Sequence, residues 1–369
     1  MDWTSVQKSI IIHIKAVSKL EFIIFKERFI KMQAKKELFD KYNDQDIQKF
    51  TLTNDNGVSI SVISLGATWQ AFNFPDKNGK TANVLLSQAS SKKIMANQYF
   101  CQAIGRTAGR ITNGTFSIKG KEYHVDQNEG STTLHGGPHG FNTQVWNGSI
   151  EDNKIVLEKH IDSSEDSFPG NIDVKITWTL DDDNTATVTY SAKSDADTLF
   201  NPTQHAYFNL SDANNVYGQS LTIDADNYLE LNKDKTPSGK MISVAGSAYD
   251  FRSGQNIKNG IDDMKASVGH TYDEVYVIND HKVEDPIATL SDPDSGRQVS
   301  IFSNRNALVV FTPDDLDGVK FERGAGVPHM GIAMEAQTLP DTPNHKGFGD
   351  IVLPAGEEKS YSISYKAEF

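Results

Sequence analysis

The amino-acid sequence predicts an all-β protein, a large sandwich of mainly antiparallel strands with few short helices. Short segments such as 57–64 and 171–180 alternate apolar and polar residues, which is the period of a half-buried strand. Turn-rich runs such as 181–184 separate these segments. No linker rich in Gly, Ser or Pro interrupts the pattern, so we expect one β-sandwich domain over residues 32–369.

The clearest strand candidates are four segments that place apolar side chains on one face. They are residues 57–64, 171–180, 185–191 and 359–369. Only two short segments, 35–42 and 90–96, show a pattern that favours a helix.

Composition narrows the class of partner and the compartment. The chain of 369 residues is 37% hydrophobic and 23% charged, which is typical of a soluble globular protein. A formal net charge of -13 argues against nucleic acid or an anionic membrane surface as a partner, but not against a neutral substrate. Cys101 is the only cysteine, so no intrachain disulfide can form, and we expect a cytoplasmic protein.

Residues 1–31 differ from the rest because they are net positive and carry apolar runs at 10–14 and 22–25. These runs are shorter than the ~20 residues that span a bilayer, and they lack the order of a signal peptide. We expect residues 1–31 to be an extension outside the fold, with Met32 as the natural start. The alternative is an amphipathic helix that lies on a membrane surface.

Residues 331–343, G-I-A-M-E-A-Q-T-L-P-D-T-P, predict a strand that carries a catalytic carboxylate. Alternation places Glu335 and Gln337 on one face and Ile332 and Met334 on the other. Apolar surroundings raise the pKa of a carboxyl group because burial disfavours its charged form. Glu335 is therefore a candidate general base.

Residues 200–210, F-N-P-T-Q-H-A-Y-F-N-L, predict a binding surface above a core. As a strand, this segment would place His205 and Tyr207 on one polar face, together with Thr203 and Asn209. The alternative is a solvated sheet face, although histidine and tyrosine are unusual choices for solubility alone.

Three further segments carry candidate polar groups. Residues 104–116 contain Arg106 and Arg110 among small residues, and they could equally be surface arginines. His135 precedes Gly-Gly-Pro, which lets backbone approach its imidazole, while the same residues forbid the helix that would bring His135 and His139 onto one metal ion. Residues 269–276 contain the adjacent acids Asp273 and Glu274, either of which could be a strand-edge charge.

These motifs, in this order, resemble those of the aldose 1-epimerases, also called galactose mutarotases. The resemblance runs from about Asp55 to Phe369 and includes T-P-S-G at 236–239, Y-D-F-R at 249–252 and F-T-P at 311–313. It implies a galactose-mutarotase-like β-supersandwich, in agreement with the periodicity.

The resemblance also implies residue roles. Glu335 corresponds to the general base that removes the proton from the anomeric hydroxyl, and His205 to the general acid that protonates the ring oxygen. Arg110, His135 and Asp273 correspond to contacts with the sugar.

Two other positions, Tyr207 and Gln337, complete this predicted site. We expect Tyr207, with Phe208 or Trp146, to offer a surface for the sugar ring, and Gln337 to orient the base or contact the sugar. Many relatives have asparagine before the arginine of this motif, whereas this chain has Gly109, which puts one accessory polar contact in doubt.

The implied activity is interconversion of the α and β anomers of free aldoses such as glucose, galactose or maltose. Opening and closing a hemiacetal needs an acid and a base but no nucleophile, so we expect no cofactor and no metal. The partner would be a monosaccharide or disaccharide, and the protein a monomer or homodimer.

Three alternatives stay open at this point. A glycoside hydrolase would pair Glu335 with Asp273. A hexose-6-phosphate mutarotase would need a cationic phosphate site, for which Arg106, Arg252 and Arg323 are candidates. A non-catalytic sugar-binding protein could share the same fold.

Overall fold

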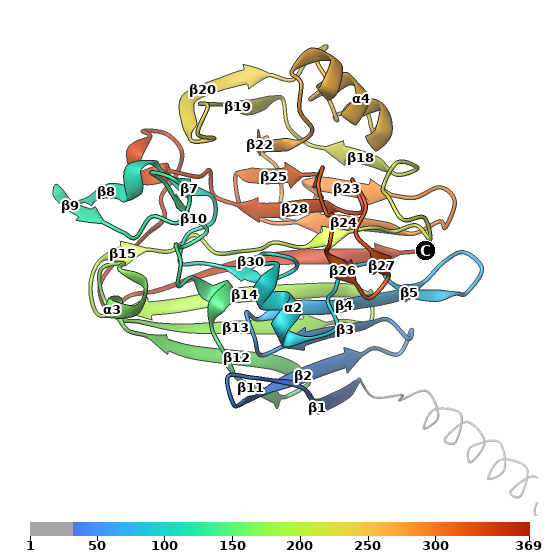
Figure 1. Ribbon diagram of the computed structural model, residues 1–369, viewed down its shortest axis with the longest axis horizontal. Helices are drawn as coiled ribbons and strands as arrows, with labels where there is room; N and C mark the ends of the chain where they lie inside the picture. The colour runs from blue at the N-terminus through green and yellow to red at the C-terminus, as the bar shows by residue number, and fades with distance from the viewer. Residues whose placement is uncertain (1–31) are drawn as a thin grey trace, which may run out of the picture.

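The computed structural model describes residues 32–369, in which strands form three main sheets stacked into a sandwich (Figure 1). The predictions made for residues 1–31 lie outside this range. All pairs of named strands within it are antiparallel, and helices are few and short, as predicted. No helix in this range is long and apolar enough to cross a membrane.

The first sheet has five strands in the order β1-β2-β3-β4-β5. Their bounds are β1 Gln33–Tyr42, β2 Gln45–Thr53, β3 Ser59–Ile63, β4 Thr68–Pro75 and β5 Thr81–Asn83. The helix predicted for residues 35–42 is wrong, because this segment is strand β1 and pairs with β2 from Gln33 to Tyr42. Asn43 and Asp44 both have positive φ in the connecting turn, which is the geometry that joins two twisted strands tightly.

The second sheet has nine strands in the order β11-β12-β13-β14-β30-β24-β23-β18-β21. Their bounds are β11 Asn147–Glu151, β12 Lys154–Ile161, β13 Ile172–Leu180, β14 Thr185–Ser194, β18 Ser220–Ile223, β21 Gln255–Asn256, β23 Ala288–Ser291, β24 Gln298–Phe302 and β30 Glu358–Glu368. The strands predicted from alternation around residues 171–180, 185–191 and 359–369 are confirmed as β13, β14 and β30.

The third sheet has six strands in the order β17-β28-β25-β22-β19-β20. Their bounds are β17 Tyr207–Phe208, β19 Asn227–Leu231, β20 Pro237–Ser243, β22 Asp273–Val277, β25 Ala307–Phe311 and β28 Ile332–Gln337. β28 holds the candidate base and pairs on both sides, with β17 and β25.

Short strand pairs and helices lie outside the three main sheets. The pairs are β6 Ala103–Ile104 with β16 Thr203–Gln204, β7 Arg110–Ile111 with β10 Thr133–Leu134, β8 Thr115–Ile118 with β9 Lys121–His124, β15 Thr198–Leu199 with β29 Val352–Leu353, and β26 Lys320–Phe321 with β27 Gly324–Ala325. The α-helices are α2 Ser91–Ala96, α3 Ser163–Asp166 and α4 Ile257–Ser267, and the 3-10 turns are Thr112–Gly114, Phe141–Thr143 and Thr342–Asn344.

Of the two predicted helices, only the one at residues 90–96 forms, as α2, and α4 was not predicted. α4 buries Ile257, Ile261 and Met264, which recur with a helical period.

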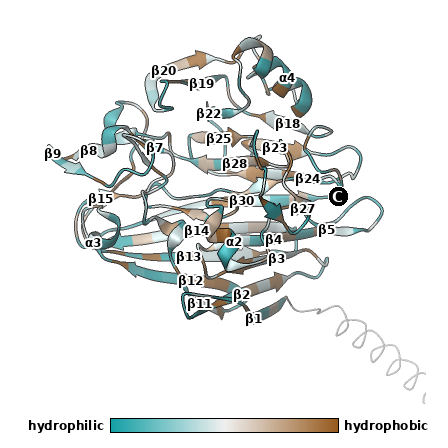
Figure 2. Ribbon diagram, viewed as in Figure 1, coloured by the Kyte–Doolittle hydropathy of each residue, from teal (hydrophilic) through white to brown (hydrophobic). Residues whose placement is uncertain are grey.

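The main hydrophobic core joins all three sheets. Trp69 of β4 packs against Trp178 of β13 and Tyr365 of β30, with ring centroids 4.7 and 4.8 Å apart. Phe208 of β17 adds the third sheet, 5.9 Å from Trp69. Hydrophobic and polar residues alternate along the strands in Figure 2, so each strand directs one set of side chains into this core.

A buried ion pair fastens the loop that follows β6. The guanidinium of Arg106 donates to both carboxylate oxygens of Asp166, at 2.6 and 2.9 Å, and both side chains are almost fully buried. Its remaining N–H groups donate to the carbonyl of Pro169 and the hydroxyl of Thr198. Arg106 therefore holds the structure together and is not available to a ligand.

This pair predicts a strong effect on stability. Asp166→Ala leaves the Arg106 charge buried without a partner, so the free energy of unfolding should fall by about 3–5 kcal/mol. Urea denaturation followed by fluorescence measures this fall. The control is Asp262→Ala, which breaks an exposed helical pair with Lys258 and should cause no measurable change. Equal effects of the two substitutions would contradict the prediction.

Candidate active site

A cavity of about 170 Å³ lies on one face of the six-stranded sheet. The register explains which side chains form its floor. Tyr207 lies opposite Ala333, Glu335 opposite Val309, and Phe311 opposite both Ala333 and Asp273, so these positions share one face. The other face, with Phe208, Ile332 and Met334, packs into the core.

Loops from elsewhere in the chain complete the walls. All seven predicted site residues line this one cavity: Arg110, His135, His205, Tyr207, Asp273, Glu335 and Gln337. Sequence positions that are more than 200 residues apart are thereby brought together.

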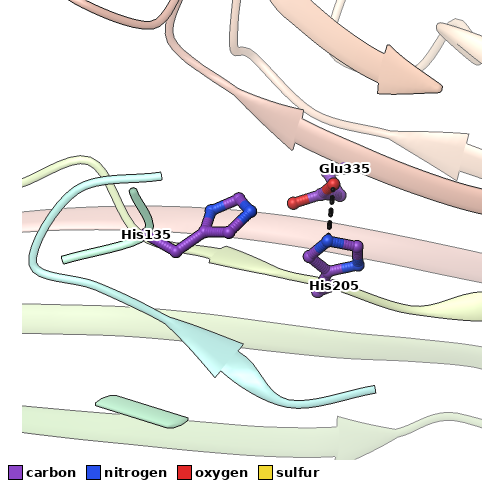
Figure 3. A group of neighbouring side chains, drawn as sticks. All are labelled: His135, His205 and Glu335. Atoms are coloured by element: carbon purple, nitrogen blue, oxygen red, sulfur yellow. Dashed lines mark ion pairs between the residues drawn. The ribbon is translucent and has the colours of Figure 1, made fainter. Parts of the chain in front are cut away.

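The candidate acid and base face each other at the bottom of the cavity. Nε2 of His205 lies 3.3 Å from Oε1 of Glu335, and their side chains are directed toward each other (Figure 3). Burial raises the pKa of Glu335 well above its ordinary value and lowers the pKa of His205 to about 4. Both shifts favour the uncharged forms, a protonated carboxyl group and a neutral imidazole, because burial disfavours an isolated charge on either side chain.

Aromatic stacking fixes the imidazole of His205. Its ring is stacked with Tyr207 at a centroid distance of 5.0 Å and with Tyr99 at 6.1 Å, at interplanar angles of 13° and 17°. Its backbone N–H donates to the carbonyl of Gln102, and its carbonyl accepts from Cys101. The ring is thus held by neighbours that leave Nε2 free to face Glu335.

The backbone around His135 sets the tautomer of its imidazole. The N–H of Gly109 donates to Nδ1 of His135 at 3.2 Å, so the ring proton lies on Nε2. Burial lowers the pKa of His135 well below its ordinary value, and the ring is neutral at physiological pH. His135 therefore presents an N–H donor to the cavity.

The backbone conformation at residue 109 and its close packing against Pro340 explain why this residue is a glycine. Gly109 has φ of 73°, and a Cβ there would lie 2.5 Å from Cβ of Pro340 and 3.4 Å from the amide nitrogen of Gln337. The side chain of Gln337 thus occupies the region that a longer side chain at 109 would approach.

Ion pairs position two of the residues that are predicted to contact the sugar, Arg110 and Asp273. Arg110 donates to both carboxylate oxygens of Glu129, at 2.5 and 2.8 Å, and this paired donation fixes the plane of its guanidinium. Asp273 pairs with the ammonium of Lys235, which also lines the cavity.

Sequence reasoning missed Tyr99, Glu129 and Lys235. Each occupies a loop, and its role arises from contacts with residues distant in sequence, so no local pattern identifies it. The sequence signal that could have identified Glu129 is its position shortly before His135.

Two expectations about the aromatic surface were wrong. Phe208 lies on the core face of β17, and Trp146 is buried against Phe141, to whose carbonyl its indole N–H donates. Neither lines the cavity, where Tyr207, Tyr99 and Phe311 are the aromatic residues.

The predicted strand at residues 200–210 is also wrong in detail. It is broken into short pieces around His205, and Thr203 and Asn209 bind the backbone carbonyls of Ala336 and Met330.

Within residues 32–369, His135, His205 and Glu335 also form a group of side chains that could hold a metal ion. Their ligand atoms lie within 4.8 Å of one another. Two imidazoles and one carboxylate are a ligand set that Zn²⁺ accepts. His139, the other histidine of the predicted His135 segment, is exposed and does not belong to this group. In the tautomer that Gly109 selects, however, His135 directs an N–H toward the cavity and offers no lone pair to a metal there.

Comparison with known proteins agrees with this geometry. The chain is 38% identical over 341 residues to the maltose epimerase of Levilactobacillus brevis, covering 91% of this chain and 99% of that protein. It is 32% identical to the galactose mutarotase of Mus musculus, covering 87% of this chain and 94% of that protein.

A solved structure shows the same fold. The galactose 1-epimerase of Lactobacillus acidophilus has a TM-score of 0.80 and 27% identity, covering 92% of this chain and 99% of that one. The predicted galactose-mutarotase-like fold is thereby confirmed. The family model for aldose 1-epimerase matches residues 48–366, and the chain belongs to this family.

Proposed function

We propose that the chain is an aldose 1-epimerase that interconverts the α and β anomers of free aldoses, glucose and galactose among them. The observation that carries this proposal is the buried pair of His205 and Glu335, 3.3 Å apart in a cavity of about 170 Å³. The family and its named relatives support the same activity.

The geometry of the pair matches the chemistry of ring opening. The anomeric hydroxyl and the ring oxygen are bonded to the same carbon, so an acid and a base that act on both must also be neighbours. Glu335 accepts the proton of the hydroxyl while His205 donates one to the ring oxygen, and the C1–O5 bond breaks to give the aldehyde. Rotation about C1–C2 followed by the reverse transfers closes the ring on the other face.

The active protonation state is the ionised form of the pair, Glu335 carboxylate with His205 imidazolium. It differs from the neutral form only by one proton moved between two atoms 3.3 Å apart. Because both forms have the same net charge, moving the proton changes only how charge is distributed within the pair.

Arg110, His135, Asp273 and Gln337 supply donors and acceptors for the remaining hydroxyls, with Tyr207 beneath the ring. The arrangement suits a polyhydroxylated ring that is held at several points. The substrate is a monosaccharide or the reducing ring of a disaccharide.

The three arginines considered as a phosphate site are engaged elsewhere in the fold. Arg106 is bound to Asp166, Arg252 pairs with Asp226 and Asp250, and Arg323 donates to backbone carbonyls. None of the three lines the cavity that contains Glu335.

The glycoside hydrolase and the non-catalytic sugar-binding protein are also weaker alternatives. A hydrolase would use Asp273 as the second carboxylate, but Asp273 is paired with Lys235. A purely binding protein would have no need for the buried pair of His205 and Glu335.

The proposal also covers the domain organisation, the oligomeric state and the cellular location of the protein. One core cluster takes side chains from Phe50 to Ala367, which supports a single domain over residues 32–369. The proposed assembly is a monomer or a homodimer, in which one copy of the chain supplies all seven predicted site residues. The single, fully buried Cys101 is in keeping with a cytoplasmic protein.

The acid and base roles predict loss of activity on substitution. Glu335→Gln and His205→Asn should each lower kcat by about 10²–10⁴-fold, because each removes one positioned proton-transfer group. Polarimetry on freshly dissolved α-D-glucose and α-D-galactose, corrected for the uncatalysed rate, measures the change. Full activity in Glu335→Gln would contradict the mechanism.

The pH dependence follows from the pKa values of the pair. The pKa of His205 is lowered to about 4, so activity should be retained as the pH falls through 6 and lost only near 4, when a second proton enters the pair. At high pH, activity should fall when the pair loses its one proton. The measurement is kcat/KM against pH, and an acid limb near the ordinary histidine pKa of about 6.5 would contradict this assignment.

The turn after His135 predicts a positional effect. Gly136 has φ of 87°, and a Cβ there would lie 2.0 Å from the carbonyl oxygen of Gly105. Gly136→Ala should displace His135 and lower kcat/KM by roughly 10- to 100-fold. Gly120→Ala is the matched control, since Gly120 has φ of 82° but open space around it. Similar kinetics in both variants would argue against a role for this turn.

A further inference from the structure

A second, larger cavity adjoins the first. Its volume is about 600 Å³, and Leu231, Lys235, Asp273 and Phe311 line both cavities. The inner cavity is smaller than the ~300–1,000 Å³ of typical ligand pockets, whereas the two together fall within that range. A ligand with one ring in the inner cavity can therefore extend past Asp273 into the second.

The outer cavity forms where the six-stranded sheet splits. β19 and β22 pair only at Asn227 with Val277 and at Tyr228 with Tyr276. Beyond Tyr228 the two strands diverge, and residues of both line the cavity between them. In Figure 1, β19 and β20 stand apart from β25 and β28 at this end of the sheet.

An unused carboxylate lies in this split. Glu274 follows Asp273 on β22 and so projects to the opposite face, where it is only 5% exposed yet lines the outer cavity. Its carboxylate has no hydrogen-bond partner within residues 32–369, and the nearest cationic candidate, Nδ1 of His270, is 4.0 Å away. Glu274 is thus available to a ligand.

The surroundings of Glu274 suit an uncharged, polyhydroxylated ligand. Tyr228 and Tyr249 stack beside it with ring centroids 4.0 Å apart, and they offer an aromatic surface of the kind that packs against a sugar ring. Burial raises the pKa of Glu274 to about 8, so its carboxyl group is protonated at neutral pH and can both donate to and accept from hydroxyls.

We propose that the outer cavity is a subsite for the second ring of a reducing disaccharide, whose reducing ring occupies the inner cavity. Glu274 binds hydroxyls of that second ring, and Tyr228 packs against it. This inference rests on the proposed function, because the inner cavity must hold the ring that is opened. Glu274 acts on specificity and takes no part in proton transfer.

The test compares kcat/KM for glucose with that for maltose, lactose and isomaltose in wild type and in Glu274→Leu. Leucine has nearly the same size and removes the hydroxyl contacts. We expect kcat/KM for at least one disaccharide to fall tenfold or more, mainly through KM, with glucose unchanged within twofold. Glu274→Gln should restore part of the loss, because an amide can also donate and accept.

Controls separate this inference from the proposed function and from a structural role. Glu284→Leu makes the same change beside a separate cavity that shares no residue with either subsite, and it should leave all kinetics unchanged. Inactive wild type on glucose and galactose would refute the proposed function. Active wild type that rejects all three disaccharides, or a Glu274→Leu variant that affects glucose and disaccharides alike or neither, would refute the subsite alone.

Discussion

The candidate active site depends on two buried side chains that lie against each other, the carboxyl group of Glu335 and the imidazole of His205. Glu335 is 2% exposed and His205 is 5% exposed, and an isolated charge on either would be strongly disfavoured there. Sharing one proton removes the net charge. This arrangement requires a strand paired on both sides to hold Glu335 and two aromatic rings to hold His205, and β28, Tyr207 and Tyr99 provide both. The three sheets supply the rigid support for that strand.

Alternation predicted the strands that bury one face. β13, with every second residue buried, is recognisable in the sequence because core and solvent impose different residue types on its two faces. β1 was mistaken for a helix because its residues are mostly exposed or partly exposed, so no core face imposes a pattern. The helix α4 escaped notice because Gly260 and Asn259 lower helix propensity within its otherwise regular apolar spacing.

The candidate site was more predictable than its supports. Residues that carry the chemistry occur in distinctive motifs, and all seven predicted ones line one cavity. Lys235 could not be found in this way, since its contact with Asp273 depends on how a turn is placed across from β22. Alternation within residues 200–210 already placed Tyr207 on the face of His205 and Phe208 on the other, and the pairing of Tyr207 with Ala333 agrees with it.

Adjacent residues on β22 are directed to the two different cavities. Asp273 and Glu274 project to opposite faces, so Asp273 can reach the ring that is opened while Glu274 faces the second cavity. The proposed base, Glu335, is held by β28, which is paired on both sides, and the proposed acid, His205, lies in the short segment between β16 and β17. The outer cavity lies where pairing between β19 and β22 ends, so its shape can change without moving Glu335 or His205. Substitutions in the splayed strands should therefore alter which sugars are accepted before they alter how the ring is opened.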